Sequence, residues 1–353
     1  MALSRRDKFF KTVRREMEGY IPYDFDLSPS QIERFRQKTG AQDYRDYYDL
    51  PMRFVAVSPE KRNIDFMKYF DSQDGGITFD EWGVGHKKGT LEHFTKMQHP
   101  MENFQSLEEF QKYPYPDPVK DYKWDGFAEK VAELKERDLI VVASMAITIF
   151  EIAWYLRGME RFLIDMMTDP ELACYHMDRI TSIRCECARR YVMAGVDVLH
   201  IGDDVATQID MMMSPDVWRE FLKPRLKKVI DAAREVKEDI IIDYHSDGNI
   251  QKIIPDLIEI GVDVLNPVQP ECMDPVEIKQ QYGDRLSFRG TIGTQTVMPF
   301  GTPEEVDEVC REMIQKVGKG GGFILAPTHV IEPEVPWENI EAMINAVKKY
   351  SRY

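Results

Sequence analysis

The stretch "DIIIDYHSDGNI", residues 239–250, changes character within a few positions. Its first half is apolar and β-branched, which predicts a short buried β-strand ending near Tyr244. A polar run with two titratable side chains, His245 and Asp247, follows at once. Because these two residues are two positions apart, they point to the same side if the extended backbone continues. A buried strand that ends in such a run is a candidate functional site.

The same order of elements recurs from Leu139 to the end of the chain. Short apolar runs at 139–144, 195–202, 239–245, 261–267, 285–290 and 321–327 are each followed by an amphipathic segment. Three of these segments begin with a capping residue and a proline, as helices do, at Ser214–Pro215, Asp274–Pro275 and Thr302–Pro303. Strands that alternate with helices predict βαβ units and a parallel sheet buried on both faces.

The steady alternation favours a closed α/β barrel over an open doubly wound sheet, because nothing in the sequence marks a reversal of strand order. No GxGxxG or GxxxxGK[ST] motif follows any of the runs, so a nucleotide site is not expected. We therefore expect a single (β/α)8 (TIM) barrel domain over residues 1–353, regular over 139–353 and irregular over 1–138. In the irregular part, Tyr20–Pro29 is a candidate early strand, and 71–118 is expected to be an insertion that forms a lid.

Composition narrows the classes of function. The chain has 46 Lys and Arg against 61 Asp and Glu, a formal net charge of −15, which argues against a nucleic-acid or anionic-membrane surface. We expect no membrane span, since no run of about 20 apolar residues exists, and no secretory signal at the charged first residues. The five cysteines form no CxxC pair, which fits a reduced, cytoplasmic setting. A homodimer is left open.

Side chains at the carboxyl ends of barrel strands face one shared mouth, so the polar residues that follow the predicted strands form a candidate site. The candidate catalytic residues are His245, Asp203 and Asp204. The candidate metal ligands are His245, Asp247, His329 and Glu332, and Glu334 is a neighbouring acid. The candidate substrate-binding residues are Trp82, Gln208, Tyr244, Asn266, Gln269 and Gln295.

Two interpretations of these residues stay open. Two histidines with one or two carboxylates form a ligand set that suits zinc and other divalent metals that accept nitrogen and oxygen. Alternatively, His245 and His329 cap their strands by hydrogen bonding to neighbouring carboxylates. Asp203 and Asp204 could likewise cap the segment that follows them.

Three stretches together resemble the uroporphyrinogen decarboxylase superfamily. They are "YHSDGNIQKIIPDLIEIGVDVLNPVQPE" (244–271), "FRGTIGTQTVMPFGTPEEV" (288–306) and "GGFILAPTHVIEPEVPWENI" (321–340). The resemblance implies a single-domain (β/α)8 fold and one of two activities. One is the cofactor-free decarboxylation of uroporphyrinogen, and the other is methyl transfer to or from a corrinoid protein, often with zinc.

The first third of the chain departs from the decarboxylase pattern. Decarboxylases of the superfamily carry an arginine-rich motif after their first strand, which holds the many carboxylates of the tetrapyrrole. The corresponding region here reads "PYDFDLSPSQIERF" (22–35), with Asp24 and Asp26 where positive charge would be needed. An acidic mouth cannot hold a polyanion, so this departure argues against a decarboxylase.

The candidate metal ligands also depart from the thiol-methylating branch, which places zinc on a His-x-Cys motif and a later Cys. Here the motif is His245-Ser246-Asp247 and the later position is His329. A set without thiolates leaves the metal harder and more Lewis acidic, which suits polarising an oxygen of the methyl donor.

The resemblance therefore implies a methyltransferase that moves a methyl group from a small donor to Co(I) of a separate corrinoid protein. The donor would be an ether or a methylamine and could be aromatic. Two alternatives remain. One is a carboxy-lyase acting on uroporphyrinogen or another acid, and the other is a barrel that binds a ligand without turnover.

Overall fold

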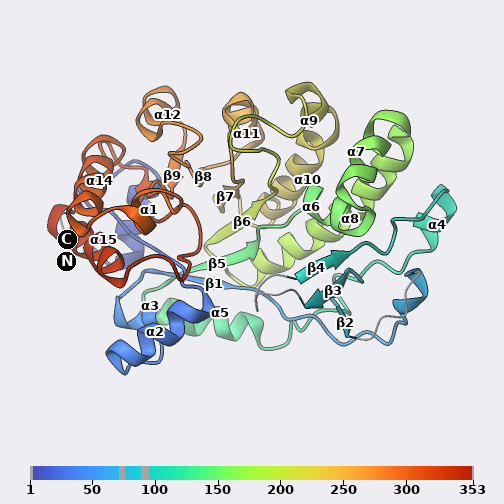
Figure 1. Ribbon diagram of the computed structural model, residues 1–353, viewed down its shortest axis with the longest axis horizontal. Helices are drawn as coiled ribbons and strands as arrows, with labels where there is room; N and C mark the ends of the chain where they lie inside the picture. Colours follow the sequence, from blue (N-terminus) through green and yellow to red (C-terminus); the bar gives the residue numbers. More distant parts are fainter. Residues whose placement is uncertain (1–2, 71–75, 89–94, 352–353) are drawn as a thin grey trace.

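A curved parallel sheet forms the centre of the computed structural model, which describes residues 3–70, 76–88 and 95–351 (Figure 1). Its seven strands are hydrogen-bonded in the order β1-β5-β6-β7-β8-β9-β10. They are β1 (Met52–Val55), β5 (Ile140–Met145), β6 (Val198–Gly202), β7 (Ile241–His245), β8 (Val264–Asn266), β9 (Ser287–Arg289) and β10 (Phe323–Ile324). Each pair of neighbours is parallel. The six strands expected from the sequence are present, and β1 is one that sequence analysis missed.

The segment expected to be an early strand lies beyond β10. Tyr23 pairs in parallel with Leu325, and Leu27 pairs with Ile331. The Asp24 N–H donates to the Leu325 carbonyl at 3.0 Å. This segment takes the place of the eighth strand of the barrel. The predicted (β/α)8 fold is confirmed.

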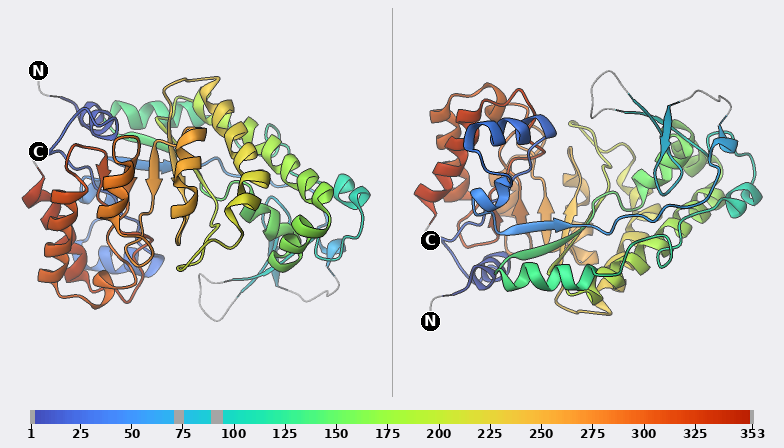
Figure 2. Two further views of the ribbon diagram at one scale, coloured as in Figure 1. Left: turned by 90° about the horizontal axis from the view of Figure 1, so that it is seen from above. Right: turned by 90° about the horizontal axis from the view of Figure 1, so that it is seen from below.

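Most of the helices cover the outer side of the sheet, and the first of them packs against the amino-terminal end of the barrel interior (Figures 1 and 2). They are α1 (Arg5–Val13), α2 (Pro29–Thr39), α3 (Tyr44–Tyr47), α4 (Leu107–Lys112), α5 (Phe127–Glu136), α6 (Phe150–Arg157), α7 (Met159–Thr168), α8 (Pro170–Met193), α9 (Pro215–Phe221), α10 (Lys223–Arg234), α11 (Ile254–Ile260), α12 (Pro275–Tyr282), α13 (Val297–Phe300), α14 (Pro303–Lys316) and α15 (Trp337–Tyr350), with short 3-10 turns at η1 (Met67–Tyr69) and η2 (Gln251–Ile253).

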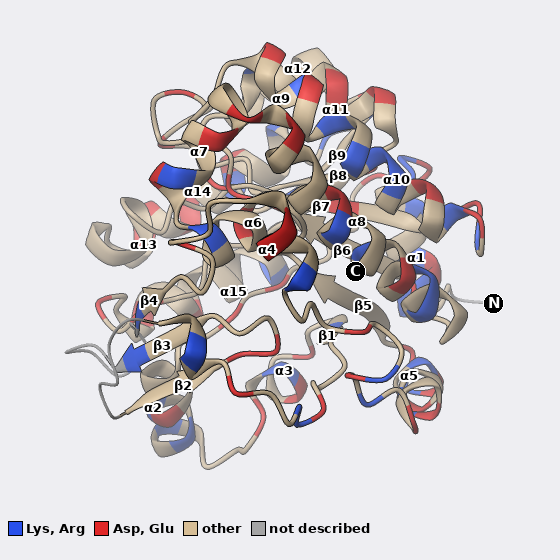
Figure 3. Ribbon diagram, turned by 90° about the vertical axis from the view of Figure 1, so that its right-hand side faces the viewer, with Lys and Arg blue, Asp and Glu red and all other residues tan. Residues whose placement is uncertain are grey.

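The predicted helix starts are correct. Ser214, Asp274 and Thr302 each accept a hydrogen bond from a backbone N–H in the first turn of α9, α12 and α14. Acidic and basic residues are interspersed along the helices rather than separated into faces (Figure 3). Within the described ranges, no helix is both long and apolar enough to cross a membrane. The cytoplasmic location stays a prediction.

The barrel interior has an apolar layer at its amino-terminal end. Inward-facing residues of the strands form one buried cluster with two residues of α1. Its members are Phe9, Val13, Met52, Ile140, Val142, Val198, Ile241, Val264 and Ile324. Because side chains alternate along a strand, the inward positions two residues further on form the next layer. On β6, β7 and β8 that layer is polar and consists of His200, Asp243 and Asn266.

The insertion contains a separate antiparallel sheet, β2-β3-β4, made of Ile77–Phe79, Gly85–Lys88 and Thr95–Gln98. Its described part packs beside α6 and α8 (Figure 1). The buried Arg157 at the end of α6 donates to the carbonyls of Met101, Glu102 and Phe104. Residues 71–75 and 89–94 of the expected lid lie outside the described residues.

A buried histidine joins the insertion to the helices. His176 of α8 is 1% exposed. Its Nε2 lies 3.0 Å from the Ala153 carbonyl and its Nδ1 lies 2.8 Å from the Tyr115 hydroxyl. A carbonyl can only accept, so Nε2 carries the hydrogen and Nδ1 accepts from Tyr115. This arrangement requires a neutral ring, and burial lowers the pKa of His176 to about 4.

Acid should therefore destabilise the fold through His176. Below about pH 6.5 the unfolded chain takes up a proton at this ring, and the folded chain does not until near pH 4, so stability falls with decreasing pH across that window. The expected loss is ~3 kcal/mol of unfolding free energy. His176→Gln keeps a donor and an acceptor but cannot titrate, so urea unfolding between pH 4 and 7 should show a shallower acid decline. An unchanged decline in the variant would contradict this.

Candidate active site

A cavity of about 290 Å³ lies inside the carboxyl-terminal half of the barrel, above the apolar layer. We call it the inner chamber. It is lined by Asp24, Phe25, Asp26, Phe54, Ser144, Ala146, His200, His245, Asn266, Arg289, Ala326, Pro327, Thr328, His329 and Val330. Most of these residues occupy inward strand positions or the turns after strands, where sites of parallel barrels lie.

An outer cavity of about 300 Å³ adjoins the inner chamber and shares Thr328, His329 and Val330 with it. Its other lining residues are Asp247, Gln269, Thr294, Gln295, Glu332 and Glu334. Three of them are acids. Among the described residues that line the two cavities, Arg289 is the only lysine or arginine.

The orientation of the His245 ring is set by Asn266, one strand away. His245 Nδ1 lies 2.8 Å from Asn266 Oδ1, and Asn266 Nδ2 donates to the Arg289 carbonyl at 3.0 Å. Because the amide nitrogen is engaged there, Oδ1 must accept, and His245 Nδ1 carries the hydrogen. The opposite ring nitrogen, Nε2, is left for chemistry. Metal-binding histidines are oriented by partners of this kind.

His245 Nε2 faces two carboxylates. It lies 3.8 Å from Asp204 Oδ1 and 4.0 Å from Asp247 Oδ1. The Asp247 N–H donates to Asp204 Oδ1 at 2.8 Å. This hydrogen bond holds the Asp204 carboxylate next to Asp247. Burial raises the pKa of Asp247, and the Asp204 charge adds to that effect.

These three residues offer ligand atoms that all lie within 4.8 Å of one another. A neutral Nε2 has no hydrogen for either carboxylate, so a lone pair and two negative oxygens converge. A cation between them, either a metal ion or a proton on Nε2, relieves this repulsion. One nitrogen and two oxygen donors fit zinc and similar divalent metals.

Asp203, the acid next to Asp204, binds backbone N–H groups. Its buried carboxylate accepts hydrogen bonds from the N–H groups of Thr148, Ile149 and Glu151, at 3.0 to 3.1 Å. Burial raises its pKa to about 6. The residue lines neither mouth cavity, and it holds the turn that begins α6.

Glu151, in the first turn of α6, is a residue that sequence analysis missed. Its Oε2 accepts from the Asp204 N–H at 3.1 Å, and its Oε1 accepts from the Tyr155 hydroxyl at 2.9 Å. Burial, with repulsion from Asp203 and Asp204, raises its pKa to about 8. An acid in the first turn of a helix is common, so the sequence carried no distinguishing signal.

A buried ion network lies below His245. Arg289 donates to Asp243 Oδ2 from Nε and Nη2 at 3.0 and 2.8 Å, and His200 Nδ1 lies 3.0 Å from the same oxygen. Burial alone would raise the pKa of Asp243, but Arg289 and His200 lower it to about 2. Arg289 Nη2 also donates to Asn266 Oδ1 at 2.9 Å. The network therefore supports the residue that orients His245.

The remaining predicted ligands lie on the rim. His329 lines both cavities and is exposed. It is not among the three residues whose ligand atoms converge, although its charge acts on Asp247. Glu332 and Glu334 line the outer cavity, as do the predicted substrate-binding residues Gln269 and Gln295.

Three other predicted substrate-binding residues lie elsewhere. Gln208 is on the exposed loop after β6 and hydrogen-bonds to Gln295. Tyr244 is 1% exposed and lines neither mouth cavity, because it alternates with the inward-facing His245. Trp82 is 4% exposed within the insertion, where the Arg184 guanidinium lies 5.2 Å from its ring centroid. The structure thus does not bring Tyr244 or Trp82 into the site.

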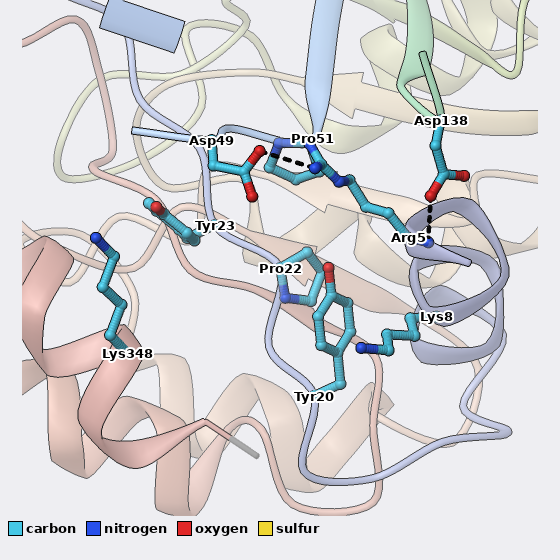
Figure 4. Close-up of a pocket in the computed structure, with 9 residues that line it drawn as sticks. All are labelled: Arg5, Lys8, Tyr20, Pro22, Tyr23, Asp49, Pro51, Asp138 and Lys348. Carbon is cyan, nitrogen blue, oxygen red and sulfur yellow. Dashed lines mark hydrogen bonds and ion pairs between the residues drawn. The ribbon is translucent and has the colours of Figure 1, made fainter. Parts of the chain in front are cut away.

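A third cavity, of about 390 Å³, lies near the amino-terminal ends of β1 and β5 (Figure 4). Arg5 is bound there on both sides, by the Asp49 carboxylate at 2.7 Å from its guanidinium and by Asp138 at 2.6 Å from its backbone nitrogen. The carboxylates of Asp49 and Asp138 are thus both bound to Arg5. The cavity also lies at the amino-terminal face of the barrel, which contributes to stability rather than to catalysis, so we interpret it as structural.

The contacts of Asp203 predict a large effect on stability. Asp203→Ala leaves several buried N–H groups without an acceptor, which should cost ~3 kcal/mol of unfolding free energy in urea titration. Asp210→Ala, an exposed acid on the same loop, should change it by less than about 1 kcal/mol. Equal stabilities of the Asp203 variant and the wild type would contradict this role.

Comparison with protein families gives one match that covers most of the chain. The model for uroporphyrinogen decarboxylase (URO-D) matches residues 92–350.

Individual relatives fall into two groups. The methylcobamide:CoM methyltransferase MtaA of Methanosarcina barkeri is 34% identical over 176 residues, which are 49% of this chain and 48% of that protein. The methylated-thiol–coenzyme M methyltransferase of Methanosarcina mazei is 25% identical over 224 residues, 62% and 56% of the two chains. A uroporphyrinogen decarboxylase of Chlorobium phaeovibrioides is 27% identical over 190 residues, 53% and 51%. The chain thus spans about half the length of the curated relatives it matches.

Among solved structures, a methyltransferase from Methanosarcina mazei superposes with a TM-score of 0.73 and 20% identity, over 99% of both chains. This likeness shows that the two proteins share their fold.

Proposed function

The chain belongs to the uroporphyrinogen decarboxylase family, and on that premise we propose that it is a methyltransferase that passes a methyl group from a small donor to the corrinoid of a separate protein. The donor is an ether or a methylamine. Because the relatives include both methyltransferases and decarboxylases, the site must decide between them. The observation that carries the proposal is the convergence of His245 Nε2, Asp204 and Asp247 at the barrel mouth.

The charges of the mouth favour a methyltransferase over a decarboxylase of a polyanion. Arg289 is already paired with Asp243, and Arg45, beside the mouth, is paired with Asp26. Asp24 and Asp26 line the inner chamber. A substrate with many carboxylates would meet these acids, and the described residues that line the two cavities include no unpaired lysine or arginine to hold it.

Demethylation of an ether or amine leaves negative charge on the departing oxygen or nitrogen. Asp204, His245 and Asp247 would hold zinc, which supplies Lewis acidity to that atom when bound. Asn266 keeps His245 Nδ1 protonated and directs Nε2 toward the site. Without metal, the same nitrogen can hold a proton for the leaving atom, as a general acid. The donor lies in the chamber, and the corrinoid reaches the methyl carbon from the mouth.

Removal of His245 should therefore abolish most turnover. With a reduced corrinoid protein and a methylated donor, His245→Ala should slow methyl transfer by on the order of 100-fold, read from the absorbance change of the corrinoid. Asp210→Ala is the control and should match the wild type. Without the corrinoid protein, no variant should consume the donor. Full activity of His245→Ala, or release of carbon dioxide from uroporphyrinogen by the wild type, would contradict the proposed function.

Zinc affinity tests the same site without turnover. Asn266→Ala removes the partner that orients His245, so it should weaken zinc binding about 10- to 100-fold in a chelator competition. Asp204→Ala should weaken it at least as much. Glu334→Ala, which removes an exposed acid of the outer cavity, is the matched control and should bind zinc like the wild type. Equal affinities across all four proteins would place the metal elsewhere.

A further inference from the structure

The wall of the inner chamber includes a buried histidine, one ring nitrogen of which has no role in the site described above. His200 is 6% exposed and lines the chamber. Its Nδ1 is bound to Asp243 at 3.0 Å, whereas its Nε2 has no hydrogen-bond partner among the described residues. Since Nδ1 donates to the carboxylate, Nε2 is a hydrogen-bond acceptor within the cavity. This nitrogen is not sealed off by the protein but is open to the chamber, where a ligand can donate a hydrogen bond to it.

Asp24 lines the same chamber and is 4% exposed. Burial next to Asp26 raises its pKa to about 7, so near neutral pH its carboxyl group can donate as well as accept. Asp26 differs, because its carboxylate is bound to Tyr44 and Arg45. The chamber thus presents a hydrogen-bond acceptor, His200 Nε2, and a carboxyl group that can donate or accept, that of Asp24.

The rest of the chamber wall is apolar or neutralised. Phe25 and Phe54 line it together with Ala326 and Pro327. The Phe54 ring packs edge-to-face against His200, with centroids 5.5 Å apart. Arg289 lies 5.3 Å from the Phe54 centroid, but its charge is matched by Asp243. Such walls suit a flat, uncharged body, and Asp24 and Asp26 disfavour a carboxylate on it.

We propose that the inner chamber binds the body of the methyl donor, and that His200 and Asp24 select an uncharged, flat donor that carries a hydroxyl group. This inference rests on the proposed function, since it names the substrate class of the same site. The hydroxyl donates to His200 Nε2 and its oxygen pairs with Asp24, while the methylated oxygen lies toward His245. A site built to hydrogen-bond a hydroxyl rejects an analogue that lacks it.

Two probes of one shape test this selection. In 2-methoxyphenol the hydroxyl is free, and in 1,2-dimethoxybenzene it is capped by a methyl group. Isothermal titration calorimetry of the wild type, without a corrinoid protein, should show 2-methoxyphenol binding about tenfold tighter or more. Equal affinities, or no binding of either probe, would overturn the proposal.

Substitutions of His200 and Asp24 test whether these two residues cause the preference for 2-methoxyphenol. His200→Phe keeps a flat ring but removes the acceptor, and Asp24→Leu removes the second partner, so each should bring the two affinities together. Asp24→Leu leaves the Arg289 network intact and serves if the His200 variant does not fold. Asp210→Ala changes an exposed acid that lines neither cavity, so it should keep the tenfold difference. Selection that persists in both His200→Phe and Asp24→Leu would overturn the proposal.

This outcome is separable from failure of the proposed function. Selective binding of 2-methoxyphenol without methyl transfer to any corrinoid protein would refute the methyltransferase and leave the chamber assignment standing. Methyl transfer that favours the dimethoxy probe would refute the chamber assignment alone.

Discussion

In a closed parallel sheet every second side chain points toward the barrel axis, and this alternation determines what the rest of the structure can do. One set of inward positions is apolar and is plugged by Phe9 and Val13 of α1. Two residues further along, β6, β7 and β8 carry His200, Asp243 and Asn266, and Arg289 joins them from β9. The first layer supplies hydrophobic stability, and the second can therefore be polar, buried and held in place from below.

Burying an ionised group is costly unless it is paired and hydrogen-bonded. The polar layer satisfies this condition, because Asp243 accepts from Arg289 and His200, and Arg289 continues to Asn266. Asn266 then fixes the tautomer of His245. The network thus ends at Nε2 of His245, which faces Asp204 and Asp247. Asp203 positions a second part of the site, because its carboxylate accepts from the N–H of Glu151 and so holds the turn that carries Glu151.

Local patterns predicted much of this from the sequence. The six apolar runs and the caps at Ser214, Asp274 and Thr302 depend on neighbouring residues, and the structure has them. The four-residue β1 was missed because it is short and contains a charged residue, Arg53. The sequence pointed to His245, Asp247 and Asp204 because polar residues follow a strand there, and their ligand atoms lie within 4.8 Å of one another. His200 and Asp243 were missed because they lie inside apolar runs, although counting back by two from His245 reaches Asp243. The positions of Trp82 and His329 depend on how distant segments pack, which no local pattern encodes.

The donor set is the central claim, since it separates this chain chemically from a thiolate zinc site. X-ray absorption spectroscopy of the zinc-loaded protein measures that set directly. We expect nitrogen and oxygen ligands at ~2.0–2.2 Å from the zinc, with an imidazole contribution that is lost in His245→Ala. A sulfur shell at ~2.3 Å, or an imidazole signal that persists in that variant, would contradict it.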